Sequence, residues 1–316
     1  MPSGSSMFAD ADGYQAAMRD VLDVLVLRPC EFHARLNWIE FRQLYLVRAH
    51  ESSARVGFLS LPADRVFVTF PTQRSSVLLA AGAVLPFGDI LLHSRGDCLH
   101  QRTTGSCHWG YISLSPDSLK NLGRTVTGQV LVPPGRSRTL RPSPQDRQRL
   151  LRLHAQAGRI AETNLALVGR QEVLHGLEQD LTLALVSCLT SGELQVDRAT
   201  LHHQAAMLTQ FEALLAKHPH AQIHISEICC EIGVSEASFR AACTNLLGMS
   251  PGRYQRSRRL KSLRSELARA DFQTDDGIEI MKRYGFVDVH RFVTEYWKTY
   301  GELPPLPPRH AGIRGG

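Results

Sequence analysis

Six basic residues stand between Arg253 and Arg264 in the stretch GRYQRSRRLKSLRSEL, and no acidic residue lies among them. Cationic side chains in such a run could contact the phosphates of a nucleic acid, or they could simply form a solvated helix face. Leu260, Leu263 and Leu267 recur at helical spacing within the same stretch. They predict one helix of about 18 residues, roughly 27 Å long. The basic run alone leaves both interpretations open.

Histidines in the first half of the chain raise a second kind of chemistry, metal-dependent catalysis. His93, His100 and His108 are separated by seven and eight residues, and no His-x-His pair stands near them. A metal site of the cupin type needs two histidines one residue apart, then a glutamate and a distant histidine. No nucleophile elbow, phosphate loop or dinucleotide fingerprint occurs in a suitable context. We therefore expect no catalytic residue, no metal ion and no cofactor.

The cysteines do not predict a disulfide framework or a zinc site. There are seven, their spacing is irregular, and no CxxC motif occurs. An odd number without such a motif is typical of reduced, buried thiols. The neighbouring Cys229 and Cys230 fall within a predicted helix, where we expect them to pack as small apolar side chains.

Composition places the chain among ordinary globular proteins. It has 316 residues, 43% of them hydrophobic and 21% charged, with a net charge of +6. This length allows two domains, and the mild positive charge permits nucleic-acid binding without proving it. No apolar run approaches the roughly 18 residues that cross a bilayer, and the first residues lack the pattern of a secretory signal. We therefore expect a cytoplasmic protein that does not associate with membranes.

The elements that would position these residues fall into two groups. Between residues 36 and 135, seven short apolar runs separated by turn formers predict a β sandwich or barrel. They are LYLVRA, ARVGFLSL, DRVFVTF, SVLLAAG, DILLHS, WGYISLS and GQVLVPP. Residues 136–144 read as a connector, and residues 143–190 as helices. The second of these helices carries leucines at helical spacing, which could pack on the β unit or form a dimer seam.

The predicted fold class is α+β, with a jelly-roll or cupin-like β domain and its helices followed by an all-helical domain. The predicted boundaries are a sensor and dimerisation domain at 1–190, a polar linker at 191–202, a helical domain at 203–304 and a disordered tail at 305–316. Within the β domain, five aromatic residues could line a ligand pocket or belong to the core. They are Trp38, Phe67, Phe70, Trp109 and Tyr111.

An internal repeat organises the helical domain. EICCEIGVSEASFRAACTNLLGMSP recurs as EIMKRYGFVDVHRFVTEYWKTYGELP, with Gly233 matching Gly285 at a shift of 52 and Phe239 matching Phe292 at a shift of 53. In each copy a first helix ends at the glycine and a second one starts at a cap residue, Ser235 or Asp288. This is the pattern of a helix-turn-helix, and two copies in register are a much stronger signal than one.

Residues 205–304 resemble the DNA-binding domain of AraC/XylS-type transcription regulators. The elements GVS, F, LGMSP, YGF, HRF and YG stand in the expected order over about a third of the chain. The resemblance implies seven helices, in which the second helix of each unit reads the major groove. Met281 departs from the family pattern, which has a small residue there. The front half resembles the cupin-like sensors of this family, and more loosely regulators of the ethanolamine-operon type.

The resemblance implies a set of DNA-contacting positions. They are Glu236, Ala237, Ser238, Arg240 and Ala241 in the first reader helix, His290, Arg291, Thr294 and Lys298 in the second, and Arg256 and Arg259 in the connector. Arg240 and Arg291 are the best candidates for a guanine edge or a phosphate. For Arg291 the competing interpretation is an ion pair with Glu295. We expect Asp288 to cap its helix rather than touch a base.

Taken together, the sequence predicts a sequence-specific transcription regulator that binds double-stranded DNA in two adjacent major grooves. Most of its affinity would come from phosphate contacts of the basic connector. RNA polymerase, a small-molecule effector and a second copy in a homodimer are candidate partners. Whether it activates or represses is left open. The alternatives are a cupin-type metalloenzyme and a protein-interaction module with a helical appendage.

Overall fold

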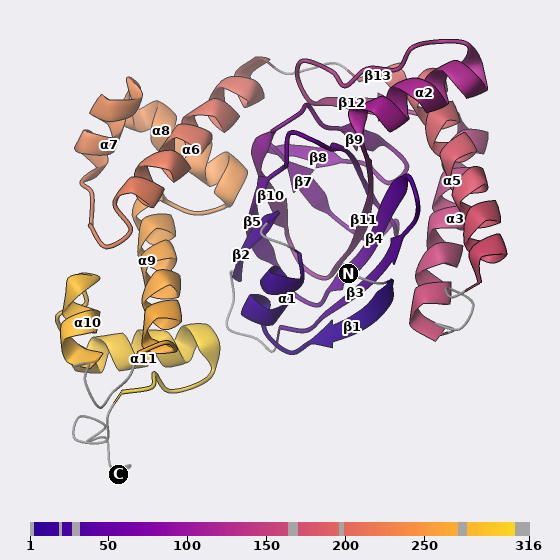
Figure 1. Ribbon diagram of the computed structural model, residues 1–316. Coiled ribbons are helices and arrows are strands. Elements are labelled where there is room, and N and C mark those ends of the chain that lie inside the picture. Colours follow the sequence, from indigo (N-terminus) through magenta and orange to yellow (C-terminus); the bar gives the residue numbers. More distant parts are fainter. Residues whose placement is uncertain are drawn as a thin grey trace. The chain divides into compact units, whose positions relative to one another are not determined.

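The computed structural model describes residues 3–18, 21–26, 32–163, 170–195, 199–270 and 277–306. Within this part, the chain folds as two compact units (Figure 1), one formed by residues up to Leu201 and the other by residues from His202 onward. Each unit is described by itself below. Cys30 and residues 307–316 of the predicted tail lie outside the described residues.

The first unit is built on two antiparallel sheets, which confirms the predicted sheet-rich half. One sheet has the order β1-β3-β4-β11-β6-β9-β12-β13 and the other the order β2-β5-β10-β7-β8. The strands are β1 (Gly4–Phe8), β2 (Leu22–Val26), β3 (Ala34–Glu40), β4 (Leu44–Glu51), β5 (Arg55–Ser60), β6 (Val66–Pro71), β7 (Leu78–Ala80), β8 (Ala83–Leu85), β9 (Ile90–Leu92), β10 (Cys98–Thr103), β11 (Cys107–Leu114), β12 (Arg138–Arg141) and β13 (Glu193–Leu194).

Side chains along the strands point alternately to the two faces of the sheet, and this divides the core of the unit into two layers. In β6, Val66 and Val68 join one apolar cluster while Phe67 joins the other. Because successive side chains of a strand point to opposite faces, one central strand can serve both layers. The layer that includes Phe67 also takes residues from both sheets, so it is the interior of the sandwich.

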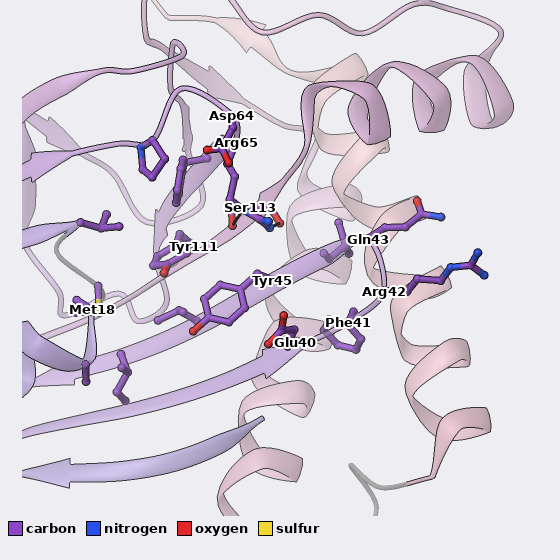
Figure 2. A pocket seen from close by; sticks show the side chains of 17 residues that line it. Met18, Glu40, Phe41, Arg42, Gln43, Tyr45, Asp64, Arg65, Tyr111 and Ser113 are labelled. Carbon is purple, nitrogen blue, oxygen red and sulfur yellow. Dashed lines mark hydrogen bonds between the residues drawn. The ribbon is translucent and has the colours of Figure 1, made fainter. Parts of the chain in front are cut away.

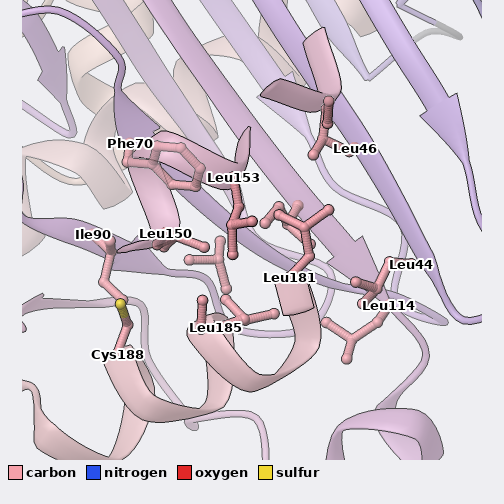
Figure 3. Packing of buried hydrophobic residues seen from close by; sticks show 14 of the residues in the cluster. Leu44, Leu46, Phe70, Ile90, Leu114, Leu150, Leu153, Leu181, Leu185 and Cys188 are labelled. Carbon is pink, nitrogen blue, oxygen red and sulfur yellow. The ribbon is translucent and has the colours of Figure 1, made fainter. Parts of the chain in front are cut away.

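The outer face of the larger sheet is covered by a helical hairpin. It consists of α3 (Pro144–Thr163) and α5 (Gln171–Ser191), which pack on each other and lie along the sheet (Figure 1). Leu181, Leu185 and Cys188 of α5 are fully buried against residues of β4, β6, β9 and β11 (Figure 3). The leucine stripe of α5 is therefore part of the domain core, and the dimer seam considered from its spacing is not available on this face.

Several stretches differ from the sequence prediction. The prediction missed α2 (Pro116–Thr127), where Ser115 caps the helix by accepting from Ser118 N and Pro116 occupies the first turn. GQVLVPP follows α2 and is not a strand, since its prolines cannot donate to a ladder and its valines are exposed. The predicted connector contains β12 and the predicted linker contains β13, which pair with each other at the edge of the larger sheet. A further helix, α1 (Ala11–Ala17), follows β1 near the start of the chain.

The second unit is helical, as predicted. Within residues 199–270 and 277–306 it contains six helices, and the seventh that the resemblance implied is not among them. They are α6 (Ala199–Lys217), α7 (Ile225–Ile232), α8 (Glu236–Leu247), α9 (Pro251–Leu267), α10 (Gly277–Arg283) and α11 (Val289–Tyr300). Figure 1 shows α9 running from the α7–α8 pair to the α10–α11 pair.

The two ends of α9 carry separate small cores. At one end Phe239 of α8 meets Phe211 of α6 edge to face, with ring centroids 5.0 Å apart. At the other end Phe292 and Tyr296 of α11 pack with the leucines of α9, and Met281 lies fully buried beside them. A methionine is long and unbranched, so it can fill the space in this core where the family pattern has a smaller side chain.

Candidate nucleic-acid interface

The first reader helix, α8, is fixed by the turn before it. Gly233 ends α7 with φ of 74°, a left-handed conformation that a residue with a Cβ rarely adopts. Ser235 then caps α8 by accepting a hydrogen bond from Ser238 N at 3.2 Å. Phe239 and Cys243, both with 0% exposure, hold one face of α8 to the core. The opposite face is consequently turned to solvent.

All five positions expected to contact DNA in α8 lie on that solvent face: Glu236, Ala237, Ser238, Arg240 and Ala241. Arg240 pairs with Glu236 one turn earlier at 3.2 Å, and both side chains are about half exposed, at 54% and 47%. An exposed pair of this kind contributes little stability, so Arg240 could exchange its partner for a phosphate or a base at small cost.

The second reader helix, α11, is built in the same way. Gly285 ends the preceding helix with φ of 75°, and Asp288 caps α11 by accepting from Arg291 N at 3.0 Å. Phe292 and Tyr296 are both 1% exposed and anchor the inner face. The repeat seen in the sequence is thus also a repeat of backbone geometry.

The outer face of α11 carries His290, Arg291, Thr294 and Lys298, all exposed. The alternative considered for Arg291 is an ion pair with Glu295. The Glu295 carboxylate instead accepts hydrogen bonds from Arg256 of α9. Thr294 donates its hydroxyl to His290 O at 2.9 Å, which leaves the hydroxyl oxygen able to accept.

Helix α9 is continuous over 17 residues, as the leucine spacing predicted. At about 1.5 Å per residue it is roughly 26 Å long, against roughly 34 Å between successive turns of a major groove. Ser250 caps its start and Pro251 occupies the first turn. An unbroken helix of this length is a rigid spacer between the two helix-turn-helix units.

Most cations of α9 are engaged within the protein, in contrast to the expectation of a phosphate-binding connector. Arg256 pairs with Glu295, Arg258 with Glu212 at 3.3 Å, and Arg264 with Glu302 at 2.8 Å. These acids come from elements before and after α9, so the pairs fasten the helices of this unit to the spacer. Arg253 near the start of α9 is exposed.

Arg259 is also engaged in hydrogen bonds within the protein. It is 4% exposed, and its guanidinium donates to Tyr284 O at 2.9 Å and to Gln222 Oε1 at 3.3 Å. Burial lowers the pKa of this guanidinium from its usual value, with the neighbouring Arg256 contributing in the same direction. We therefore leave Arg259 out of the DNA-contacting set, because reaching a phosphate would break these bonds.

Sequence reasoning missed one large side chain on the outer face of α11. Trp297 is 55% exposed, although tryptophan is usually largely buried. It follows His290 and Thr294 by seven and three residues, which places all three on one side of the helix. The helical spacing of the polar positions could have shown that this tryptophan belongs to the polar stripe rather than to the core.

The residues considered for metal chemistry do not come together. His93 bonds Thr69 Oγ1 at 3.0 Å, His100 packs on Phe58, and His108 stacks on His50 with centroids 4.0 Å apart. In the described ranges, no group of three or more histidine, cysteine or acidic side chains is arranged to hold a metal ion. The same part of the chain has no helix that is long and apolar enough to span a membrane.

A cavity of about 310 Å³ opens between α1 and the larger sheet of the first unit (Figure 2). Tyr45, Phe67 and Tyr111 line it, with the Tyr111 ring 6.2 Å from Tyr45 and 5.5 Å from Phe67. Arg65 borders it and is held by Ser113, donating from Nε to the hydroxyl at 3.1 Å and from Nη2 to the carbonyl at 2.9 Å. All five aromatics weighed for a pocket lie in or against the core of this unit, and of these Phe67 and Tyr111 also line the cavity.

Comparisons with known proteins agree with the geometry of the second unit. Residues 228–305 match the family model described as "Helix-turn-helix domain". The "Probable thc operon regulatory protein" of Rhodococcus erythropolis is 31% identical over 160 residues, which cover 44% of this chain and 48% of that protein. The chain therefore spans about half the length of the curated relative it matches.

Solved structures also align along most of the chain. The AraC-like transcriptional activator CuxR aligns over 83% of this chain and 94% of its own, at 16% identity and a TM-score of 0.44. ToxT from Vibrio cholerae aligns over 84% of this chain and 97% of its own, at 12% identity and a TM-score of 0.29. The family match and the repeated geometry together establish that residues 228–305 form a helix-turn-helix domain of AraC type.

Proposed function

We propose that the protein is a transcription regulator that binds double-stranded DNA by placing α8 and α11 in two neighbouring major-groove segments. The observation that carries the proposal is the pair of capped helices at opposite ends of one unbroken spacer, each with a solvent-exposed polar face. Arg240 and Arg291 supply base or phosphate contacts, and Lys298 a phosphate contact.

Selection of bound fragments from a random DNA library, followed by fluorescence anisotropy on the selected duplex, tests this function. Arg240→Ala and Arg291→Ala are each expected to weaken binding about 10-fold or more. Leu183→Ala, an exposed position on α5, is the matched control and should bind as the wild type does. If no fragment is enriched, or if both arginine variants keep full affinity, the proposed interface is wrong.

The cavity of the first unit supports a role for a small-molecule effector. Its aromatic walls suit a compact apolar body, and Arg65, fixed by Ser113, suits an acidic group at the rim of the cavity. Titration calorimetry with a panel of small aromatic carboxylic acids tests this role. Arg65→Met should abolish binding of any hit, and Arg42→Ala, an exposed arginine beside the same cavity, should not. A hit that survives Arg65→Met contradicts the assignment of the acidic group.

The two competing hypotheses, a metalloenzyme and a protein-interaction module, are each tested by a separate measurement. A stoichiometric iron, manganese or zinc ion in the purified protein would favour the metalloenzyme. Binding of protein partners by a chain that binds no duplex at low salt would favour the interaction module. RNA polymerase contact and a homodimer remain part of the regulator hypothesis, to be tested by pull-down on the selected DNA and by mass measurement in solution.

A further inference from the structure

The side chain of Trp297 lies outside the core of the second unit. Its neighbours in the sequence, Tyr296 and Tyr300, pack inward with Phe292, while Trp297 is 55% exposed. The other two tryptophans of the chain, Trp38 and Trp109, belong to the first unit. Keeping a large apolar ring in water has a cost that a bound partner would remove.

The surroundings of Trp297 say what kind of partner fits. His290, Arg291 and Lys298 share the exposed face of α11 with it. The acid of this helix segment, Glu295, turns its carboxylate to Arg256 of α9. A ring set among polar and cationic side chains fits a polyanion with an apolar surface between its charges, which describes the sugar–phosphate backbone of DNA.

The position of Trp297 along the helix decides which part of DNA it meets. Helix α11 begins at Val289, so His290 and Arg291 lie in its first turn and Trp297 in its third. In a helix-turn-helix it is the first residues of the reader helix that reach the base edges. A side chain two turns further on faces the wall of the groove.

We propose that Trp297 packs its indole ring against a deoxyribose at the wall of the groove entered by α11, with the indole N–H donating to a neighbouring phosphate oxygen. This rests on the proposed function and adds a contact that is independent of base sequence. The indole carries no charge and displaces no counterion, so the contact adds affinity without adding to the salt dependence of binding.

Anisotropy with a fluorescein-labelled duplex of mixed sequence, over a series of KCl concentrations, tests this contact without knowledge of the operator. Trp297→Ala is expected to weaken binding about 10-fold at every salt concentration, with an unchanged slope. Lys298→Ala should instead reduce the slope of log affinity against log salt by about 1. Trp297→Phe should fall between wild type and Trp297→Ala, and Leu183→Ala should match wild type. Equal far-UV circular dichroism confirms that each variant is folded.

Acrylamide quenching of tryptophan fluorescence gives an independent readout. Trp109 is 1% exposed, Trp38 is partly buried and Trp297 is 55% exposed, so the quenchable emission that is lost in Trp297→Phe reports on the Trp297 ring. Adding the duplex should protect this component. Full quenching in a DNA-bound sample, or an unchanged affinity of Trp297→Ala, overturns the inference and leaves the DNA-binding function standing. Protection that rises with protein concentration without DNA shows a self-contact and also overturns it. Failure of the wild type to bind any duplex at low salt overturns the proposed function itself.

Discussion

Replacing Arg256 with alanine distinguishes a structural ion pair from a phosphate contact. Arg256 donates from Nε and Nη2 to the two carboxylate oxygens of Glu295, and its guanidinium lies 5.0 Å from the ring centroid of Phe286. The hydrogen bonds that Arg256 donates to Glu295 raise the pKa of this guanidinium. The pair joins the spacer α9 to the reader helix α11, so its loss should lower the local stability of α11 where it packs on α9.

The magnitude follows from the exposure of the two side chains, which is 32% for Arg256 and 28% for Glu295. A half-buried pair with two parallel hydrogen bonds is worth about 1 kcal/mol, more than an exposed pair and less than a fully buried one. The contact with the Phe286 ring adds about 0.5–1 kcal/mol. Arg256→Ala should therefore lower the local stability of α11 by about 2 kcal/mol, equivalent to about 30-fold faster opening.

Hydrogen–deuterium exchange of the full-length protein, read on peptides from α11, measures this opening without requiring the whole chain to unfold in one step. Glu295→Ala and the double variant complete a cycle in which about 1 kcal/mol of coupling is expected. Arg253→Ala is the matched control on the same helix, because this arginine is exposed. It should leave exchange of α11 unchanged. If Arg256→Ala leaves exchange unchanged too, while lowering the salt slope of DNA binding by about 1, then Arg256 works at a phosphate and the reasoning fails.

Three further predictions concern caps, a buried histidine and a buried ion pair. Ser235→Ala and Asp288→Ala should each lower the thermal stability of the second unit by about 1 kcal/mol, seen in melting curves, whereas Gly or Asn at these positions should restore most of the loss. Burial lowers the pKa of His154 to about 3, with Arg48 acting in the same direction. The unfolded chain therefore takes up a proton at a higher pH than the fold does, and stability is complete above about pH 6.5 and falls by up to about 1.4 kcal/mol per pH unit below it. A melting temperature of the first unit that stays flat from neutral pH to pH 4 would contradict this. Glu51, fully buried beside Arg55, accepts from its Nε, and Glu51→Gln should destabilise the first unit by about 3 kcal/mol because the arginine loses its counter-charge. Unaltered urea denaturation of this variant would show that the pair is dispensable.

Local features of the second unit could be predicted from the sequence alone. Glycine at the turn, a short polar side chain at the cap and apolar residues at helical spacing act over a few residues, so their order along the chain is enough to place α7 to α11. The same holds for the alternating strands of the first unit. The α+β fold class and the AraC-type helix-turn-helix repeat were therefore both predicted correctly. Short-range signals did not predict α1, α2, β12 or β13, and they predicted a strand at GQVLVPP that the structure does not have.

Tertiary structure decided which side chains remain available for binding. The run between Arg253 and Arg264 contains no acid, so the sequence indicated a basic surface, but its counter-charges lie elsewhere in the chain, some of them about 40 residues away, on Glu212, Glu295 and Glu302. Folding likewise turned the leucines of α5 onto the sheet and left Trp297 in solvent. Helical period fixes which residues share a face, but what that face meets depends on how distant elements pack, and burial and ion pairing are properties of that packing.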